Sequence, residues 1–187
     1  MTILHVLWLP ILLSAAFVFV ASSLIHMALS FWHRSDYSKV PQEDAVMDAL
    51  RPFGLPPGDY FSPLCSSMAE MKTPAFTEKL KKGPVVMLTV MPSGPMNMGR
   101  NLFLWFLYLL VVSYLAAYVG GHALPAGGGR GAILRIVGVT SFLGYAAALW
   151  QMSIWYRRSL TTTFKSTVDG VIYAAITAYT FACFWPK

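Results

Sequence analysis

Four long apolar segments constrain this chain more than any other feature. They run from about Ile3 to Phe31, Asn101 to Gly121, Ala132 to Tyr156 and Val168 to Trp185. At about 1.5 Å per helical residue, each can cross a hydrocarbon core about 30 Å thick. Backbone amides in lipid must be paired within the protein, so segments of this length and composition cross as helices. The sequence therefore predicts an all-α membrane protein, a four-helix transmembrane bundle.

The first apolar segment has a competing interpretation, a signal peptide that is removed. The small residues Ala21, Ser22 and Ser23 resemble a cleavage site. However, no Lys or Arg precedes the apolar run, and the run is too long for the core of a signal peptide. These two observations favour a retained transmembrane helix at residues 1–31.

The charge composition argues against a soluble nucleic-acid-binding protein. Only 12% of the 187 residues are charged, about half of the usual fraction in soluble domains. The net charge of +6 comes mostly from Lys and Arg beside the apolar segments, as in membrane orientation signals. We expect the lipid bilayer and other membrane-protein subunits as partners, and no nucleic acid.

The distribution of basic residues predicts the orientation. The connector between the first two segments contains eight Lys and Arg residues, and the connector between the last two contains Arg157, Arg158 and Lys165. The positive-inside rule then places both connectors in the cytoplasm and both termini on the outer, periplasmic side. Size and composition are typical of bacterial inner-membrane proteins, so we expect that location. Aromatic residues near the segment ends, as at a membrane interface, are Trp32, Trp105, Trp150, Trp155, Tyr156 and Trp185.

Residues 32–100 form the longest polar stretch, and their pattern predicts a small α/β insertion. Prolines and acidic residues mark a helix in PQEDAVMDALRPFG, and a short strand is expected at Tyr60–Leu64. Thr73 and Pro74 mark the start of a second helix that ends at Gly83, and Val85–Met91 is expected to be a buried strand. We therefore expect a cytoplasmic module against the membrane surface at 32–100, followed by transmembrane helices 2–4 at 101–187.

Small residues recur at helical spacing in three of the four segments. In lipid, such residues mark faces where helix backbones approach closely. The helix-packing candidates are Gly170, Ala174, Ala178 and Ala182, then Ser113, Ala117 and Gly121, and finally Gly138, Ser141 and Gly144. The stripe in the last segment faces either its own bundle or another protein. The second segment carries a stripe at Ser113, Ala117 and Gly121 that could pack against it. This favours the first alternative, in which the last segment packs within its own bundle.

Two histidines near the end of the first segment are candidate metal ligands. His26 and His33 are seven residues apart, which places them on one helix face. Neutral imidazoles bind transition metals or haem. The alternative is an interfacial histidine beside a packed one that hydrogen-bonds to another helix.

A group of methionines is a second candidate for soft metals such as Cu(I). It comprises Met87, Met91, Met96 and Met98, within or near MPSGPMNMGR. The alternative is that Met87 and Met91 fill a core while Met96 and Met98 lie at a turn before the membrane.

Charged residues are expected only near the ends of the apolar segments. Arg135 lies about one turn into the third segment and Asp169 one residue into the fourth, at opposite membrane faces. Asp169 would then be explained by the helix dipole at a helix start. The absence of charge from the middle of every segment argues against an ion-coupled transporter.

No catalytic or cofactor motif is recognisable, so we expect no catalytic residue and no cofactor, and an enzyme is not the favoured class. The pattern favours a non-catalytic integral membrane subunit that stabilises or assembles a larger inner-membrane complex, such as an energy-converting one. The alternatives are a metal- or haem-binding membrane protein that uses His26, His33 and the methionines, and a small-solute transporter.

Overall fold

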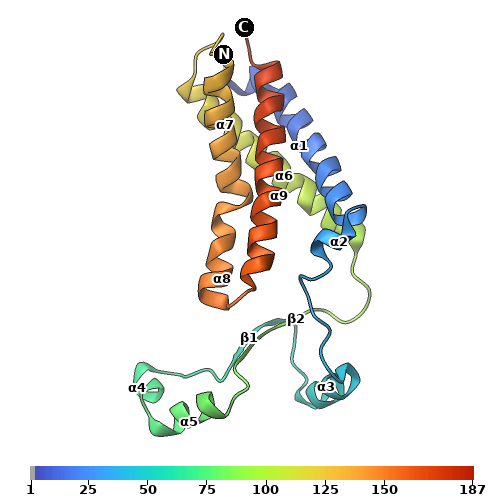
Figure 1. The fold of residues 1–187 in the computed structure, drawn as a ribbon, viewed down its shortest axis with the longest axis vertical. Helices are drawn as coiled ribbons and strands as arrows, with labels where there is room; N and C mark the ends of the chain where they lie inside the picture. The colour runs from blue at the N-terminus through green and yellow to red at the C-terminus, as the bar shows by residue number, and fades with distance from the viewer. Residues whose placement is uncertain (1–2) are drawn as a thin grey trace. The chain divides into compact units, whose positions relative to one another are not determined.

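The computed structural model describes residues 3–187 and contains four helical spans long and apolar enough to cross a membrane. They are α1 (Ile3–Met27), α6 (Met98–Ala123), α7 (Arg130–Tyr145) with its continuation, and α9 (Leu160–Phe184). The start of α1 and the end of α9 lie at the same end of the bundle (Figure 1). The helical bundle indicates a multi-pass membrane protein, in agreement with the sequence pattern.

The third span is not one continuous helix. After α7 the chain forms a short 3-10 turn, η2 (Ala147–Leu149), and then α8 (Trp150–Tyr156). Ala146, between α7 and η2, is buried and has non-helical backbone angles. The hydropathy pattern predicted the length of this span but not its interruption, because an apolar run does not distinguish a continuous helix from a broken one.

The last two helices approach closely through small residues. α9 packs on α7 and α1, whereas α6 packs on α1 and α7. A Cβ atom added at Gly170 would lie 2.5 Å from the Cβ of Ala146, and one added at Gly138 would lie 3.4 Å from the Cβ of Ala178. The stripe on α9 therefore faces its own bundle. The helix that packs against this stripe is α7. The expectation that the stripe Ser113, Ala117 and Gly121 on α6 would pack there was wrong.

The other small residues also lie at helix contacts, with one shift in position. Ser113, Ala117, Ser141, Ala174 and Ala178 are buried, and Ala182 is half-buried. Gly144 approaches Val112 of α6, where an added Cβ would lie 3.0 Å from the valine side chain. The expected contact at Gly121 is made by Gly120 instead, which packs against Val137 and Trp185. The contacts between helices bury two apolar clusters, one toward each end of the bundle.

Helix α9 begins earlier than predicted, and this changes the position of Asp169. The helix starts at Leu160, eight residues before the expected Val168, so Asp169 is its tenth residue. Polar residues extend the helix because they find partners: Thr163 Oγ1 lies 2.7 Å from Ser153 Oγ on α8. The placement of Asp169 at a helix start was therefore wrong, and so was the helix-dipole explanation.

The first span is shorter than predicted. Helix α1 ends at Met27, and a single turn, α2 (Ser30–His33), follows after Ala28 and Leu29. The backbone amides of Ala28 and Leu29 both donate to the carbonyl of Leu24, which closes the end of α1. The change in chain direction allows α2 to contact α9.

Residues Lys39–Met96 form a second compact unit, and the bundle unit resumes at Asn97. The unit contains a two-stranded antiparallel sheet, in which Gly58 pairs with Val90 and Ser62 with Val86. As predicted, Thr73 caps a helix that Pro74 opens and Gly83 ends. The predicted burial of the second strand was wrong, because its side chains alternate between half-buried and exposed. Its elements are α3 (Glu43–Leu50), η1 (Arg51–Phe53), β1 (Gly58–Ser62), α4 (Met68–Met71), α5 (Pro74–Lys82) and β2 (Val86–Val90).

Candidate metal centre

His26 lies in the last turn of α1, with one ring nitrogen engaged by the helix. Its Nδ1 is 2.9 Å from the carbonyl oxygen of Ser22, one turn earlier. A carbonyl oxygen can only accept, so Nδ1 carries the proton in this contact. In the neutral imidazole, Nε2 then holds a free lone pair. The side chain of His26 is exposed, so this nitrogen is accessible.

His33 lies on α2 between two carboxylates. Its Nδ1 is 2.7 Å from Oδ2 of Asp36, and its Nε2 is 2.9 Å from Oδ2 of Asp169. The second contact has the distance of a hydrogen bond but not its direction, and Nε2 makes no hydrogen bond within the described part of the chain. With its side chain only 16% exposed, His33 is anchored through Nδ1 and directs Nε2 toward α9.

Asp169 brings a carboxylate to the same point from α9. Its side chain is 6% exposed, and a buried carboxylate inside a span is costly unless partners compensate it. Trp32 Nε1 donates to Oδ1 at 3.1 Å, while Oδ2 faces His33. One carboxylate oxygen is thus held by a hydrogen bond and the other remains available to a cation.

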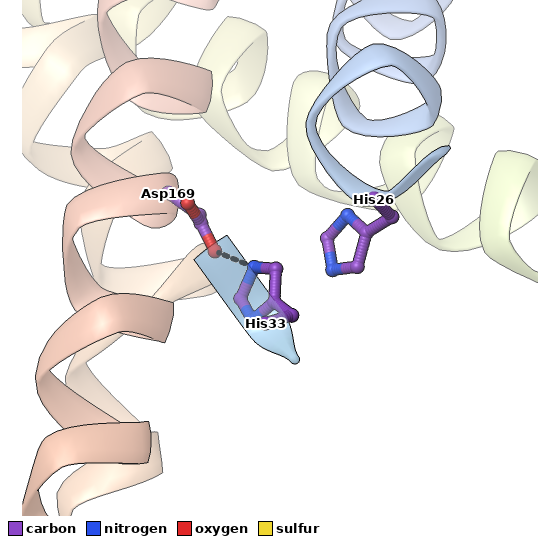
Figure 2. Close-up of side chains that lie close together, drawn as sticks. All are labelled: His26, His33 and Asp169. Carbon is purple, nitrogen blue, oxygen red and sulfur yellow. Dashed lines mark ion pairs between the residues drawn. The ribbon is translucent and has the colours of Figure 1, made fainter. Parts of the chain in front are cut away.

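His26, His33 and Asp169 together form a cluster of potential ligands. One ligand atom from each lies within 4.8 Å of the others (Figure 2). The two imidazole rings are stacked, with centroids 4.4 Å apart and planes inclined by 8°. Nearly parallel planes do not direct both lone pairs at one point, so joint ligation requires one ring to turn. His26, being exposed, is the ring with room to do so.

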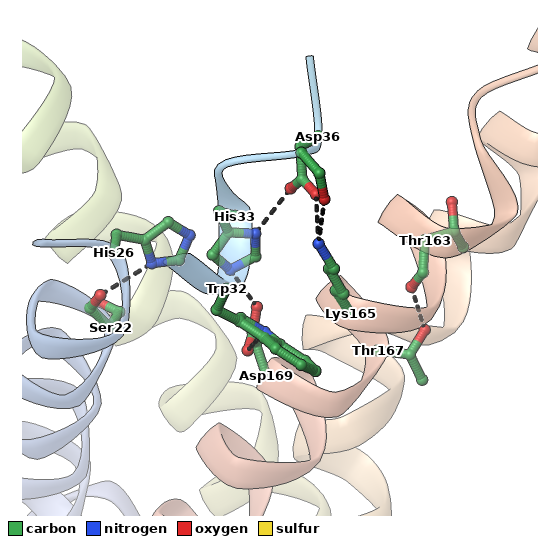
Figure 3. Close-up of polar contacts among 10 residues, drawn as sticks. Ser22, His26, Trp32, His33, Asp36, Thr163, Lys165, Thr167 and Asp169 are labelled. Atoms are coloured by element: carbon green, nitrogen blue, oxygen red, sulfur yellow. Dashed lines mark hydrogen bonds and ion pairs between the residues drawn. The ribbon is translucent and has the colours of Figure 1, made fainter. Parts of the chain in front are cut away.

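Lys165 completes the charged surroundings of the cluster (Figure 3). Its Nζ lies 2.8 Å from Ser35 Oγ, 3.5 Å from Asp36 Oδ1 and 5.6 Å from the centre of the Trp32 ring. With both histidines neutral, the two carboxylates and one ammonium group sum to a single negative charge. The cluster therefore attracts one additional cation, such as a metal ion.

A pocket of about 870 Å³ adjoins the cluster within the bundle unit. Its walls come from all four spans, and most of them are apolar or aromatic. The residues that line it are Ser22, Ser23, His26, Met27, Met98, Leu102, Trp105, Tyr108, Tyr145, Leu149, Ser166, Asp169 and Tyr173. The hydroxyl of Tyr173 is buried and has no hydrogen-bond partner among the described residues.

Sequence reasoning found the two histidines but not the residues that make them a site. His26 and His33 do lie together, although α1 ends between them instead of carrying both on one face. Asp169 was missed because it was placed at a helix end, and Trp32 because it was assigned to the membrane interface. One feature of the sequence could have indicated Asp169. Lys165 and Asp169 are four residues apart, which places both charges on one face of a helix that begins before Lys165.

The four methionines are divided between the two units of the chain. Met87 and Met91 belong to the second unit and are exposed, so the expectation that they fill a core was wrong. Met98, in the first turn of α6, lines the pocket beside the histidine cluster. Within the bundle unit, Met98 and Met27 are therefore the methionines nearest to the site.

Comparison with protein-family models, curated proteins and solved structures finds no match to this chain.

Proposed function

We propose that this chain is an integral membrane protein that binds a divalent first-row transition-metal ion through His26, His33 and Asp169. The observation that carries the proposal is the hydrogen bonding of the two histidines. Each directs its Nδ1 to a fixed oxygen, which leaves Nε2 as the ligand atom. Metal-binding histidines characteristically have such an outer partner, because it fixes the tautomer and the ring orientation. Trp32 plays the corresponding part for the carboxylate.

The donor set indicates the class of metal. Two imidazole nitrogens and one carboxylate oxygen suit zinc, iron(II), cobalt(II) or manganese(II), rather than the thioether sites of Cu(I). Three protein ligands leave coordination positions open for water or a substrate, as in catalytic sites. Two ligands each about 2 Å from a tetrahedral ion lie about 3.3 Å apart. Binding therefore draws the exposed His26 ring toward Asp169 and ends its stacking on His33.

A metal ion fits this cluster better than haem does. The stacked rings of His26 and His33 lie with centroids 4.4 Å apart, which leaves no space for a porphyrin between them. One ligand atom from each of the three residues instead lies within 4.8 Å of the others, a spread that a single ion can draw together once the His26 ring turns. An absorbance spectrum of the purified protein should accordingly lack the Soret band of haem.

We place the site at the cytoplasmic face of a bacterial inner membrane, with both termini in the periplasm. The connectors at the site's end of the bundle carry most of the Lys and Arg residues, which supports this orientation. The metal would then be acquired from the cytoplasm. Labelling of Cys65, in the unit on the same connector, with a membrane-impermeant thiol reagent should require disrupted membranes.

The second candidate function is a subunit of a larger membrane complex, and the unit Lys39–Met96 favours it. Within those residues, all of which are described, Phe76 is the one buried side chain. Phe53, Leu64 and Met68 are each at least 67% exposed, so the unit offers apolar surface to another protein. The small-residue stripe on α9 no longer supports this function, because α7 occupies it. Co-purification of defined subunits in mild detergent would support the candidate, and a monomer alone would count against it.

The metal proposal is tested by Co²⁺ titration of detergent-purified protein that carries no histidine tag and has been freed of metal with a chelator. We expect one equivalent of Co²⁺ to bind and to produce visible absorption bands. His33→Asn and Asp169→Asn should each weaken Co²⁺ binding at least about 100-fold, since removal of outer-shell partners alone costs about 10–100-fold. If wild-type protein binds no Co²⁺ at micromolar concentrations, or if His33→Asn binds it equally well, the proposal is wrong.

His122 provides a matched control. Its Nδ1 lies 2.7 Å from the carbonyl of Tyr118, one turn earlier, as Nδ1 of His26 does with Ser22. Like His26 it is exposed, but no described carboxylate joins it in a ligand cluster. His122→Asn should therefore leave Co²⁺ binding unchanged. An equal loss in His122→Asn and His26→Asn would show that exposed histidines bind Co²⁺ nonspecifically.

A further inference from the structure

The pocket beside the histidine cluster is polar at one end and apolar elsewhere. His26 and Asp169 form the polar end. Met27, Leu102 and Leu149 supply apolar walls from three different spans. Its volume of about 870 Å³ lies within the range of small-molecule sites, about 300–1,000 Å³. This division suits an amphiphilic molecule whose polar group meets the histidine cluster.

Four aromatic rings form a continuous wall of this pocket. Trp105 stacks on Tyr108 at 5.4 Å between centroids, and Tyr108 meets Tyr145 edge to face at 6.4 Å. Tyr145 meets Tyr173 edge to face at 5.8 Å, and Tyr173 returns to Trp105 at 6.3 Å. The rings come from α6, α7 and α9, so packing of the spans holds them in place. A rigid aromatic wall favours a flat ring over a flexible acyl chain, because rings stack with little loss of conformational freedom.

The polar groups of this wall are satisfied with one exception. Trp105 Nε1 donates to Ser22 Oγ at 2.9 Å, the Tyr108 hydroxyl donates to the carbonyl of Gly144, and the Tyr145 hydroxyl lies 3.4 Å from Thr177 Oγ1.

The exception is the hydroxyl of Tyr173. The residue is 5% exposed, and its oxygen has no hydrogen-bond partner in the described chain. A buried hydroxyl without a partner is costly, and an acceptor on a bound molecule would remove that cost.

We propose that the pocket binds a lipid-soluble molecule of the quinone class, a flat ring that carries carbonyl oxygens and an apolar tail. One carbonyl oxygen accepts a hydrogen bond from the Tyr173 hydroxyl, while the ring lies against the aromatic wall. The opposite edge of the ring faces His26 and Asp169. The inference rests on the proposed function in one respect, since the same two side chains hold the metal that the ring would face.

The other amphiphiles of a membrane fit this pocket less well. A phospholipid would bring its phosphate toward Asp169 and Asp36, a region that is already negative. A quaternary ammonium headgroup would suit the aromatic wall, but it offers no acceptor to Tyr173. A carbonyl-bearing ring satisfies the aromatic wall and the unpartnered hydroxyl together.

The test is calorimetric titration of the full-length protein in detergent with decylubiquinone, once with Co²⁺ bound and once without. We expect saturable binding with one site per chain. Tyr173→Phe removes only the hydroxyl, so it should weaken decylubiquinone binding about tenfold, the loss expected for one buried hydrogen bond. Tyr179→Phe is the matched control: it removes an exposed hydroxyl from the same helix and should bind like wild type.

The Co²⁺ titration separates this inference from the metal proposal. Tyr173→Phe should retain full Co²⁺ binding, whereas His33→Asn should lose it. Absence of saturable decylubiquinone binding by wild type would overturn the inference, as would equal affinity in Tyr173→Phe. A tightly bound phospholipid that decylubiquinone does not displace would also overturn it. Quinone binding without any Co²⁺ binding would instead refute the metal site and leave the pocket assignment standing.

Discussion

Replacing Gly170 by alanine should force α9 away from α7. The added Cβ would lie 2.5 Å from the Cβ of Ala146 and 3.5 Å from its Cα. Contacting carbon atoms prefer separations of about 3.5–4.0 Å, so the two helices would have to separate by on the order of 1 Å at this point. Neither group has a flexible side chain that could move aside. The strain must therefore be taken up by the backbones.

The expected loss of stability follows from this overlap. Overpacking a core by one methyl group typically costs about 1–3 kcal/mol. Alanine is favoured over glycine in a helix by up to about 1 kcal/mol, which offsets part of that cost. We expect Gly170→Ala to lower the free energy of unfolding by about 1–2 kcal/mol, as the balance of these two effects.

The assay is reversible unfolding of the detergent-solubilised protein, followed by circular dichroism. Ala146→Gly in the Gly170→Ala background should restore stability, because it removes the methyl group that the new one meets. Ala146 is the C-cap of α7 and not an interior helix residue, so glycine there carries little helix penalty. Gly138→Ala is the control, since its Cβ would lie at an ordinary 3.4 Å from the Cβ of Ala178. If Gly170→Ala is no less stable than Gly138→Ala, or if Ala146→Gly gives no rescue, the close approach of α7 and α9 is wrong.

Three further predictions concern the metal site and the bundle. Asp36→Ala removes the acceptor for Nδ1 of His33 without removing a ligand, so the Co²⁺ affinity should fall about 10–100-fold; unchanged affinity would mean that Asp36 does not orient the ring. Lowering the pH should release Co²⁺, because protons compete for the imidazole nitrogens, and titrations at several pH values measure this; pH-independent affinity would exclude histidine ligands. The buried hydrogen bond of 3.0 Å between Ser14 and Ser113 should contribute about 0.6 kcal/mol to unfolding stability; a double-mutant cycle with alanine that gives no coupling would refute it.

The sequence predicted the bundle well because a helix that crosses the hydrocarbon core must be long and apolar, and hydropathy measures this directly. All four spans were identified, and so was the capped helix between Thr73 and Gly83. Hydropathy failed where a helix continues through polar residues, as at the start of α9. There the helix is maintained by local partners such as Ser153 and Thr163, which a count of apolar residues does not register.

The candidate site was only partly predictable for a related reason. The spacing of His26 and His33 identified them as a pair, but their third partner lies more than one hundred residues later in the chain. Asp169 approaches the two histidines only because α9 is a neighbour of α1 and α2. Small-residue stripes indicate that a helix packs closely, but not which helix packs against it. The preference for α6 over α7 as the mate of α9 shows this limit, since both helices carry suitable stripes.

The packing stripe and the candidate site are parts of one arrangement. Gly170, where α9 lies close against Ala146 at the end of α7, directly follows Asp169. The contact that brings the two helices together therefore also positions the carboxylate. Tyr173, one turn later on the same helix, lines the pocket beside Asp169. A site whose ligands must be held within fractions of an ångström is best built on such rigid elements. The groups on α9 are therefore set by helix packing, and in the proposed metal site the exposed His26 is the ligand that we expect to move when a cation binds.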